Sequence, residues 1–282
     1  MTWATTFAER EHQICTTARL IEAGRSYWTA GSGSPLQAIL LARRLYVPDV
    51  LYVTEDGAID PRPALPFDPM VSMVSSRSGY KAAAWSTMNL VGYHAAAGYF
   101  DYGILNTLQI DRYGNINSSM VGRSYERPQR RFGGAGGATA IASLCWRTIV
   151  MTDLDRRKFV DRVDFITSPG YLDGTPEARE RAGMPRETGP WRVVTPWAVF
   201  GYDDQSRQMQ LLAISPWVTV DQVLGEMGFA PLVAEPIAVL DPPTEEELAI
   251  LRTELDPRGQ TTGRSPWVDL SSIPSPSGRG AG

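Results

Sequence analysis

Histidine is scarce in this chain: only His12 and His94 occur among its 282 residues. A Ser-His-Asp triad needs a histidine as its general base, and catalytic zinc sites are commonly built from histidine ligands. His12 lies in a charged stretch that predicts a helix, and His94 lies in the sequence VGYHAAAGY. We interpret both as structural residues, so an enzyme built from this chain would work without histidine.

Cysteine, long apolar runs and excess charge are also missing. Cys15 and Cys145 lie far apart and in no metal-binding spacing, which is typical of a reduced cytoplasmic protein. The N-terminal sequence lacks the basic start and apolar stretch of a signal peptide, and no run of about 18 apolar residues could span a membrane. The formal net charge of -4 argues against general electrostatic binding to nucleic acid or to an anionic membrane.

The first fifth of the chain alternates helical and strand patterns. Residues 7–24 predict an amphipathic helix closed by a glycine, and a short strand and a glycine turn follow over 26–35. A proline suits the first turn of the helix predicted over 35–46, and the sequence LYVT at 51–54 predicts another strand. This strand–turn–helix–strand order is typical of α/β proteins.

The rest of the chain adds more strands and one well-marked helix. Further strand patterns occur at 102–111, 148–153, 163–168, 191–203 and 208–215. The last two resemble a β-hairpin, and a capping box of Thr244 with Glu247 predicts the start of a helix. We therefore expect one α/β domain over residues 1–258. From 259 to 282 the chain is rich in glycine, serine and proline, which predicts a flexible tail.

The strand at 51–54 runs directly into a turn with the sequence Glu55-Asp56-Gly57. Glutamate and aspartate are common turn residues, so taken alone the turn favours a purely structural role. A carboxylate is nevertheless ionised at neutral pH and can act as a nucleophile without a general base. The rest of the chain decides between these two interpretations.

Residues 130–143, RRFGGAGGATAIAS, contain four glycines within five positions. Such a backbone can approach a ligand closely and direct N–H groups at it, and a helix can begin at ATAIAS. A dinucleotide fingerprint would need glycine or alanine at Thr139, and a P-loop would need Gly-Lys-Ser/Thr, which is absent. The residues leave two explanations open: close packing of a helix against a sheet, or a loop that binds a ligand.

Glu55 and the glycine loop together are consistent with acyl transfer through a glutamyl intermediate. A carboxylate is a weak nucleophile, so it needs an activated acyl group such as a thioester. The developing oxyanion needs hydrogen-bond donors, and one such donor lowers the barrier by about 3–4 kcal/mol. A glycine loop supplies donors of this kind, and the scarcity of histidine fits a reaction that needs no general base.

Five motifs occur in order along the chain: VPDVLYVTEDGAID, LQIDRYGNINSSMVG, RRFGGAGGATAIAS, DRRKFVDRVDFITSPGYLDG and ELDP. Together they resemble the β subunit of class I CoA-transferases, and most of all the glutaconate CoA-transferase branch. The resemblance covers about residues 8–258. It implies a single three-layer α/β domain of the NagB/RpiA-like type, in which helices cover both sides of a mixed, mostly parallel sheet.

By this resemblance Glu55 is the catalytic glutamate, which attacks an acyl-CoA and then carries CoA as a glutamyl thioester. Backbone positions assigned by the same resemblance to the acyl group and its cavity are Gly136, Gly137, Ala138, Gly31 and Gly33. Coenzyme A is then a substrate, with no permanently bound cofactor and no metal. A family β subunit completes its site only against an α subunit, which implies an α2β2 complex or a larger multiple.

Two positions depart from the family pattern. Asp56 stands where relatives have a small residue such as serine or asparagine. The sequence YGILNT precedes LQID, where relatives have a Gly-Gly or Gly-Ala pair. The second departure indicates a different acyl pocket, whereas Asp56 either suits a changed substrate or points to solvent.

Two other functions stay open from the sequence. On the same fold, relatives act as CoA-ester hydrolases, decarboxylases or retro-Claisen ring-opening enzymes of steroid breakdown. A scaffold or regulatory subunit, with Glu55 as an ordinary turn residue, is the third interpretation. The resemblance implies that members without transferase activity replace the glutamate, so the presence of Glu55 favours a CoA-transferase acting on a short-chain or dicarboxylic acid.

Overall fold

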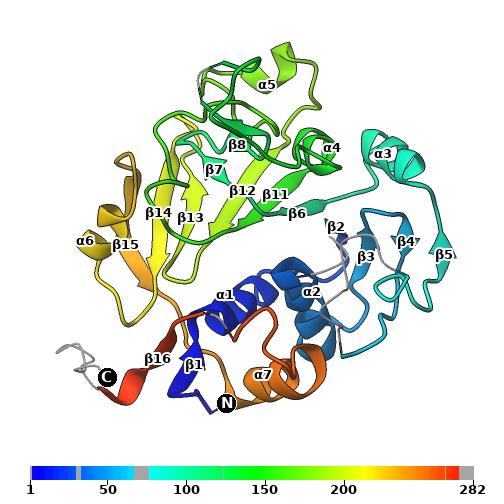
Figure 1. Cartoon of the computed structure of the whole chain (residues 1–282), viewed down its shortest axis with the longest axis vertical. Coiled ribbons are helices and arrows are strands. Elements are labelled where there is room, and N and C mark those ends of the chain that lie inside the picture. Colours follow the sequence, from blue (N-terminus) through cyan, green and yellow to red (C-terminus); the bar gives the residue numbers. More distant parts are fainter. Residues whose placement is uncertain (1, 30–32, 67–75, 123, 264, 273–282) are drawn as a thin grey trace.

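A ten-stranded mixed sheet forms the centre of the molecule in the computed structural model (Figure 1). The structure describes residues 2–29, 33–66, 76–122, 124–263 and 265–272. In spatial order the strands are β15 (Leu232–Val239), β14 (Met209–Ile214), β13 (Ala198–Tyr202), β12 (Gly189–Val194), β11 (Arg147–Met151), β6 (Tyr102–Leu105), β2 (Ser26–Thr29), β3 (Leu51–Thr54), β4 (Ala58–Ile59) and β5 (Ala84–Trp85).

The five central strands, from β12 to β3, run parallel to one another. Antiparallel strands extend the sheet on both sides, as β13 and β14 beyond β12 and as β4 and β5 beyond β3. Thr29 on β2 is level with Thr54 on β3 and with Ile104 on β6. The carboxyl ends of these three strands therefore lie side by side, at the kind of edge where α/β proteins bind ligands.

Helices cover both faces of this sheet (Figure 1). One face carries α1 (Glu9–Ala18), α2 (Gly33–Leu45) and α7 (Glu245–Ile250), which a π-helical turn continues to Leu255. The other face carries α3 (Met88–Ala96), α4 (Ala138–Leu144) and α6 (Val220–Gly225).

Alternation along the strands produces the two cores between these layers. Tyr27 and Tyr52, on neighbouring strands, are buried in the core beneath α1, α2 and α7. Trp28 and Val53, one residue further along each strand, are buried in the core beneath α3 and α4. The predicted three-layer α/β fold with a large mixed sheet is confirmed.

The capping box predicted for α7 is present. Thr244 Oγ1 accepts the Glu247 N–H at 3.1 Å, and the Glu247 carboxylate accepts the Thr244 N–H at 2.6 Å. The buried Glu247 side chain also pairs with Arg19 and accepts a hydrogen bond from Tyr46. Because Arg19 follows α1 and Tyr46 follows α2, the cap also ties three helices together.

The predicted strand at 102–111 is wrong in its length. β6 ends at Leu105, and a separate hairpin of β7 (Gln109–Ile110) and β8 (Ile116–Asn117) follows. Asn106 Oδ1 accepts the Thr107 N–H, and Thr107 Oγ1 donates to the Gln109 carbonyl. These side chains bond to the local backbone and so end the strand.

Other elements differ by smaller amounts. The helix predicted over 7–24 is α1, preceded by β1 (Thr6–Ala8), and the segment 163–168 forms only an isolated bridge from Ser168 to Ile116. The predicted β-hairpin is present as β13 and β14. The remaining short elements are β9 (Met120–Val121), β10 (Arg130–Arg131), α5 (Ala178–Arg181) and a 3₁₀ turn at Leu270–Ser272. In the described ranges no helix is both long and apolar enough to cross a membrane.

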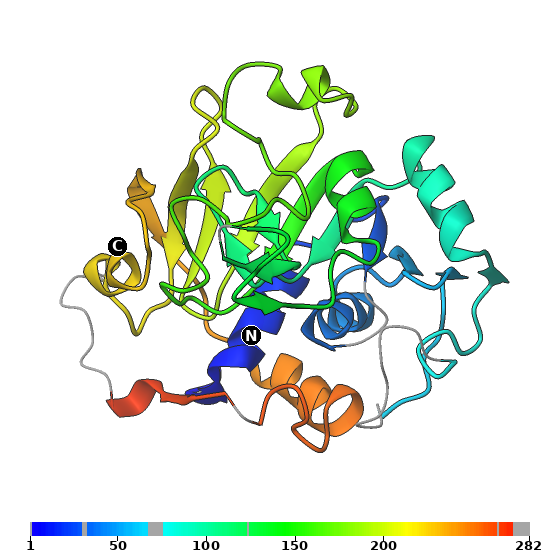
Figure 2. The ribbon, with the colours of Figure 1, turned by 45° about the horizontal axis from the view of Figure 1, so that its top comes forward.

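The chain beyond residue 258 folds back on the N-terminus. β16 (Trp267–Asp269) runs antiparallel to β1, and both figures of the whole chain show the red segment beside the blue one (Figure 2). The Asp256 carboxylate accepts the N–H groups of residues 260–262, which turns the chain toward β1. The structure therefore differs from the predicted flexible tail over 259–272, because a strand and an aspartate cap outweigh the composition. Residues 273–282 of that tail lie outside the described residues.

Truncation after Arg258 is expected to lower the free energy of unfolding by about 3 kcal/mol, because it exposes the core covered by Val268 and removes the β1–β16 pairing. Truncation after Ser272 is the matched control, since it keeps all of these contacts. Urea unfolding of both proteins measures the difference. Equal midpoints for the two truncations would contradict a structural role for β16.

Candidate active site

Glu55 follows the last residue of β3 and lies half-buried in a tight turn. The Gly57 N–H donates to the Thr54 carbonyl at 3.0 Å, and Gly57 has a φ of +100°. A Cβ at Gly57 would lie 2.6 Å from the Ser86 carbonyl oxygen, so both the backbone conformation and the space require glycine there. β3 thus holds Glu55 at the carboxyl edge, while Gly57 lets the chain reverse into β4.

The glycine loop meets the Glu55 carboxylate. Gly137, 82 residues away in sequence, donates its N–H to Glu55 Oε1 at 2.7 Å. Gly137 is also the N-cap residue of α4, so the partial positive charge at the start of that helix favours the carboxylate. Gly136 has a φ of +52°, and a Cβ there would lie 2.6 Å from Glu55 Oε1. The loop therefore approaches the carboxylate as closely as only glycine allows.

The other predicted site residues lie less directly on the carboxylate. The Ala138 N–H donates to the Ala135 carbonyl at 2.9 Å, so it is not directed at Glu55. Gly33 opens α2 at the carboxyl end of β2, and a Cβ there would meet only the Pro35 ring, at 3.8 Å. Gly31 lies outside the described residues.

Asp56, the residue that departs from the family pattern, turns back toward β3. Its Oδ1 accepts a hydrogen bond from the Thr54 hydroxyl, which in turn accepts the Ala58 N–H at 3.2 Å. The Asp56 carboxylate is therefore engaged within the turn and is not paired with Glu55. A structural role for Asp56 follows from these contacts.

The histidines lie away from Glu55. His12 is fully buried between Phe7 and Trp217, and its Nδ1 lies 3.1 Å from the Pro196 carbonyl oxygen. Burial lowers the pKa of His12 to about 4, so the ring is neutral at physiological pH. His94 lies on α3 with its ring against Tyr99. The interpretation of both as structural agrees with these positions.

Thiol and metal chemistry have no visible centre in the described part of the chain. Cys15 and Cys145 are free and buried, and burial raises the pKa of both thiols, so they stay protonated. Among the described residues, no group of three or more histidine, cysteine, aspartate or glutamate side chains could hold a metal ion. Glu55 is thus the reactive group that the described geometry exposes to the loop.

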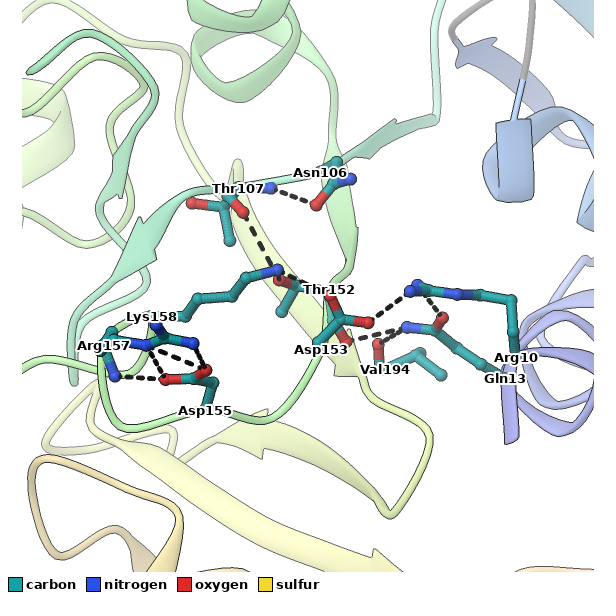
Figure 3. Close-up of polar contacts among 10 residues, drawn as sticks. All are labelled: Arg10, Gln13, Asn106, Thr107, Thr152, Asp153, Asp155, Arg157, Lys158 and Val194. Carbon is teal, nitrogen blue, oxygen red and sulfur yellow. Dashed lines mark hydrogen bonds and ion pairs between the residues drawn. The ribbon is translucent and has the colours of Figure 1, made fainter. Parts of the chain in front are cut away.

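A polar network at the carboxyl ends of β6, β11 and β12 was missed by the sequence analysis (Figure 3). Asp153, just after β11, pairs with Arg10 at 2.5 Å and with Lys158 at 2.9 Å. Gln13 on α1 donates to the Thr152 carbonyl at 2.9 Å and to the carbonyl of the last β12 residue at 2.7 Å. Each of these strand ends was recognisable in the sequence, but their adjacency depends on a strand order that one sequence does not reveal.

Known proteins resemble the chain over most of its length. The sequence profile of the family described as Coenzyme A transferase matches residues 82–226. The β subunit of glutaconate CoA-transferase from Acidaminococcus fermentans is 33% identical, over 90% of this chain and 94% of its own length. The β subunit of 3-oxoadipate CoA-transferase from Pseudomonas knackmussii is 32% identical, over 87% of this chain and 92% of its own length. The IpdB subunit of a cholesterol ring-cleaving hydrolase from Rhodococcus jostii is 31% identical over only 55% of this chain and 59% of its own.

The three-dimensional structure agrees with the sequence comparison. The crystal structure of the Acidaminococcus fermentans glutaconate coenzyme A-transferase matches with a TM-score of 0.83 at 31% identity, over 93% of this chain and 99% of the matched chain. The two CoA-transferase subunits thus match nearly the whole fold, including β3, Glu55 and the glycine loop within the span, whereas the hydrolase subunit matches about half. This chain belongs to the coenzyme A transferase family.

Proposed function

We propose that the chain is the β subunit of a CoA-transferase that moves CoA between an acyl-CoA and a short-chain or dicarboxylic acid, with Glu55 as its nucleophile. The observation that carries this proposal is the 2.7 Å hydrogen bond from the Gly137 N–H to Glu55 Oε1. It fixes one carboxylate oxygen and leaves Oε2 without a hydrogen-bond partner among the described residues. A carboxylate held in this way is positioned for attack through Oε2.

The reaction then proceeds without any net transfer of protons or electrons. Oε2 of Glu55 attacks the thioester carbonyl carbon, the C–S bond breaks, and CoA leaves as a thiolate. The thiolate attacks the Glu55 carbonyl carbon of the resulting mixed anhydride, and the donor acid departs as its carboxylate. An acceptor carboxylate reverses these steps from the glutamyl-CoA thioester and leaves as a new CoA ester. Coenzyme A enters and leaves as part of the substrates.

Gly137 has a specific task in the second of these steps. Because its N–H lies on Oε1, it stays on the glutamyl carbonyl oxygen after Oε2 has been acylated. That oxygen gains negative charge when the CoA thiolate attacks, so the hydrogen bond strengthens in the transition state. One such donor lowers the barrier by about 3–4 kcal/mol. Contacts of Gly136 and Ala138 with the acyl group remain predictions.

Trapping of the glutamyl-CoA thioester tests the proposed function. The complex is incubated with an acyl-CoA and treated with borohydride, which reduces a thioester and leaves a free carboxylate unchanged. Mass spectrometry of the peptide that contains Glu55 should then show the glutamate reduced to an alcohol, and omission of the acyl-CoA is the control. An unmodified peptide in an active complex would favour the hydrolase or decarboxylase interpretation.

The partner in this proposal is an α subunit in an α2β2 complex or a larger multiple, in the cytoplasm. The relatives named as one of two subunits support a two-subunit enzyme. The chain also has a face suited to such a partner, formed by β5, α3 and the turn that follows. This β5–α3 face exposes Trp85, Leu90, Tyr93 and Tyr99, which are 57, 47, 71 and 69% accessible. Large exposed apolar and aromatic side chains of this kind mark protein interfaces.

The β5–α3 face also adjoins the turn that carries Glu55. The Ser86 N–H donates to the Gly57 carbonyl at 2.8 Å, and Trp85 on β5 is level with Ala58 on β4. A subunit docked on this face would therefore border the Glu55 turn. Figure 1 shows β5 and α3 at the end of the molecule away from β15.

The double substitution Leu90→Glu with Tyr93→Glu is expected to weaken the αβ complex by about 100-fold or more, because two charges enter an apolar interface core. Both side chains are exposed on α3, so the isolated fold should be unaffected. Trp267→Glu, which changes a 60% exposed aromatic on β16, is the matched control. Analytical ultracentrifugation measures the dissociation, and equal affinity of both variants for the α subunit would place the interface elsewhere.

A further inference from the structure

Asn106 lies at the same edge of the sheet as Glu55. We infer that its side-chain amide selects acids that carry a second oxygen-bearing group, a carboxylate or ketone, at the end of the acyl chain remote from the thioester. The inference rests on the proposed CoA-transferase function, since it names the substrate class of that same site. Its evidence is the strand order, the fixed orientation of the Asn106 amide and the pairing of the nearby cations.

The strand order brings Asn106 within reach of an acyl group held at Glu55. β6 and β3 flank β2, and Ile104 and Thr54 are both level with Thr29. Glu55 is the first residue beyond this level on β3, and Asn106 is the second beyond it on β6. Neighbouring strands lie about 4.8 Å apart, so the two strand ends are roughly 10 Å apart. Two side chains that converge across this gap leave room for a short acyl chain.

The orientation of the Asn106 side chain is set by the backbone. Its Oδ1 accepts the Thr107 N–H at 2.7 Å, and only the oxygen of a carboxamide can accept this bond. The amide nitrogen Nδ2 therefore lies at the other end, and Figure 3 shows it on the side away from Thr107. Asn106 is exposed, and Nδ2 has no hydrogen-bond partner within the described ranges. Two N–H donors are thus directed outward at the edge.

The segment that carries Asn106 is held firmly. Thr152 Oγ1 lies 3.5 Å from the Thr107 carbonyl oxygen and 3.4 Å from Lys158 Nζ, and the Thr152 carbonyl accepts from Gln13 on α1 (Figure 3). Thr107 Oγ1 also donates to the carbonyl at the start of β7. A donor that is positioned by a rigid support loses little entropy on binding, which is what discrimination between similar acids requires.

The cations of this network are already committed. Asp153 accepts from Arg10 through Oδ1 and from Lys158 through Oδ2. A substrate carboxylate would have to displace Asp153 to reach either cation. Among the described groups of this network, the Asn106 amide is the donor that remains free for a substrate oxygen.

Glutarate and pentanoate test the inference, because both have five carbons and differ in the remote carboxylate. The αβ complex should transfer CoA from acetyl-CoA to glutarate about 10- to 100-fold more efficiently, in kcat/KM, than to pentanoate. Asn106→Asp keeps an acceptor for the Thr107 N–H but replaces the outward amide with an anionic oxygen. It should lower kcat/KM for glutarate about 100-fold and leave pentanoate within about threefold.

Gln205→Glu is the matched charge control, since it adds a negative charge in the exposed turn between β13 and β14 at the opposite edge of the sheet. A wild-type complex without preference for glutarate, or an Asn106→Asp complex with an unchanged ratio of the two acids, overturns the inference. Loss of exchange of labelled CoA into acetyl-CoA in Asn106→Asp also overturns it, because the residue would then serve the chemistry. Intact exchange in the wild type together with an unchanged ratio rejects this inference alone, whereas absence of exchange in the wild type rejects the proposed function.

Discussion

Exchange of labelled CoA into an acyl-CoA is expected to fall by about 10⁴-fold or more in the αβ complex that carries Glu55→Ala. This half-reaction needs only the donor, and it depends on the C–S bond being broken and re-formed through the glutamyl intermediate. Glu55 is half-buried and bonded to one N–H group, so water can replace the lost contact. Folding and assembly should therefore change by only about 1 kcal/mol.

Two further substitutions make this expectation specific. Glu55→Asp keeps the charge but retracts the carboxylate from the Gly137 N–H by about one methylene, which should reduce exchange about 100-fold. Asp56→Asn is the matched control, because it removes a carboxylate from the same turn that bonds to Thr54 and not to the glycine loop. Wild-type exchange in Glu55→Ala, with the complex intact, would refute the covalent mechanism.

The sequence predicted the features that depend on local patterns and on motif order. The apolar strand before Glu55, the capping box of Thr244 and the glycine loop each follow from residues close together in the chain. The family resemblance supplied the three-layer fold and the β-subunit assignment, which the comparisons bear out. The role of Glu55 stays a prediction until the substitutions above are measured.

Features that depend on distant residues could not be predicted in the same way. The bond from Gly137 to Glu55 joins residues 82 apart, so it emerges only when α4 is packed beside β3. Asn106 falls in a pattern that reads as one strand from 102 to 111, and two local side-chain bonds divide that strand. β16 lies in a Gly/Ser/Pro-rich segment, and its order comes from pairing with β1 at the other end of the chain.

The glycine loop offers a test that separates the position of Glu55 from its charge. Gly136→Ala is expected to reduce transfer roughly 100-fold while the protein still folds. The new Cβ would lie 2.6 Å from Glu55 Oε1, and the atom it meets is at the end of a flexible side chain. The side chain can move aside at little cost in stability, but a nucleophile displaced by about 1 Å loses its alignment with the thioester.

Gly134→Ala is the control that makes this result interpretable. Gly134 has a φ of +85° and Gly136 a φ of +52°, so alanine at either position costs about 1–2 kcal/mol of folding free energy from the left-handed backbone. A Cβ at Gly134 meets no atom within 4 Å, whereas the one at Gly136 meets the Glu55 carboxylate. Both variants should therefore melt at similar temperatures, and only Gly136→Ala should lose transfer. Because the two substitutions share the strain and differ in the contact, equal losses of activity would attribute the effect to the loop backbone and remove the steric argument for Glu55.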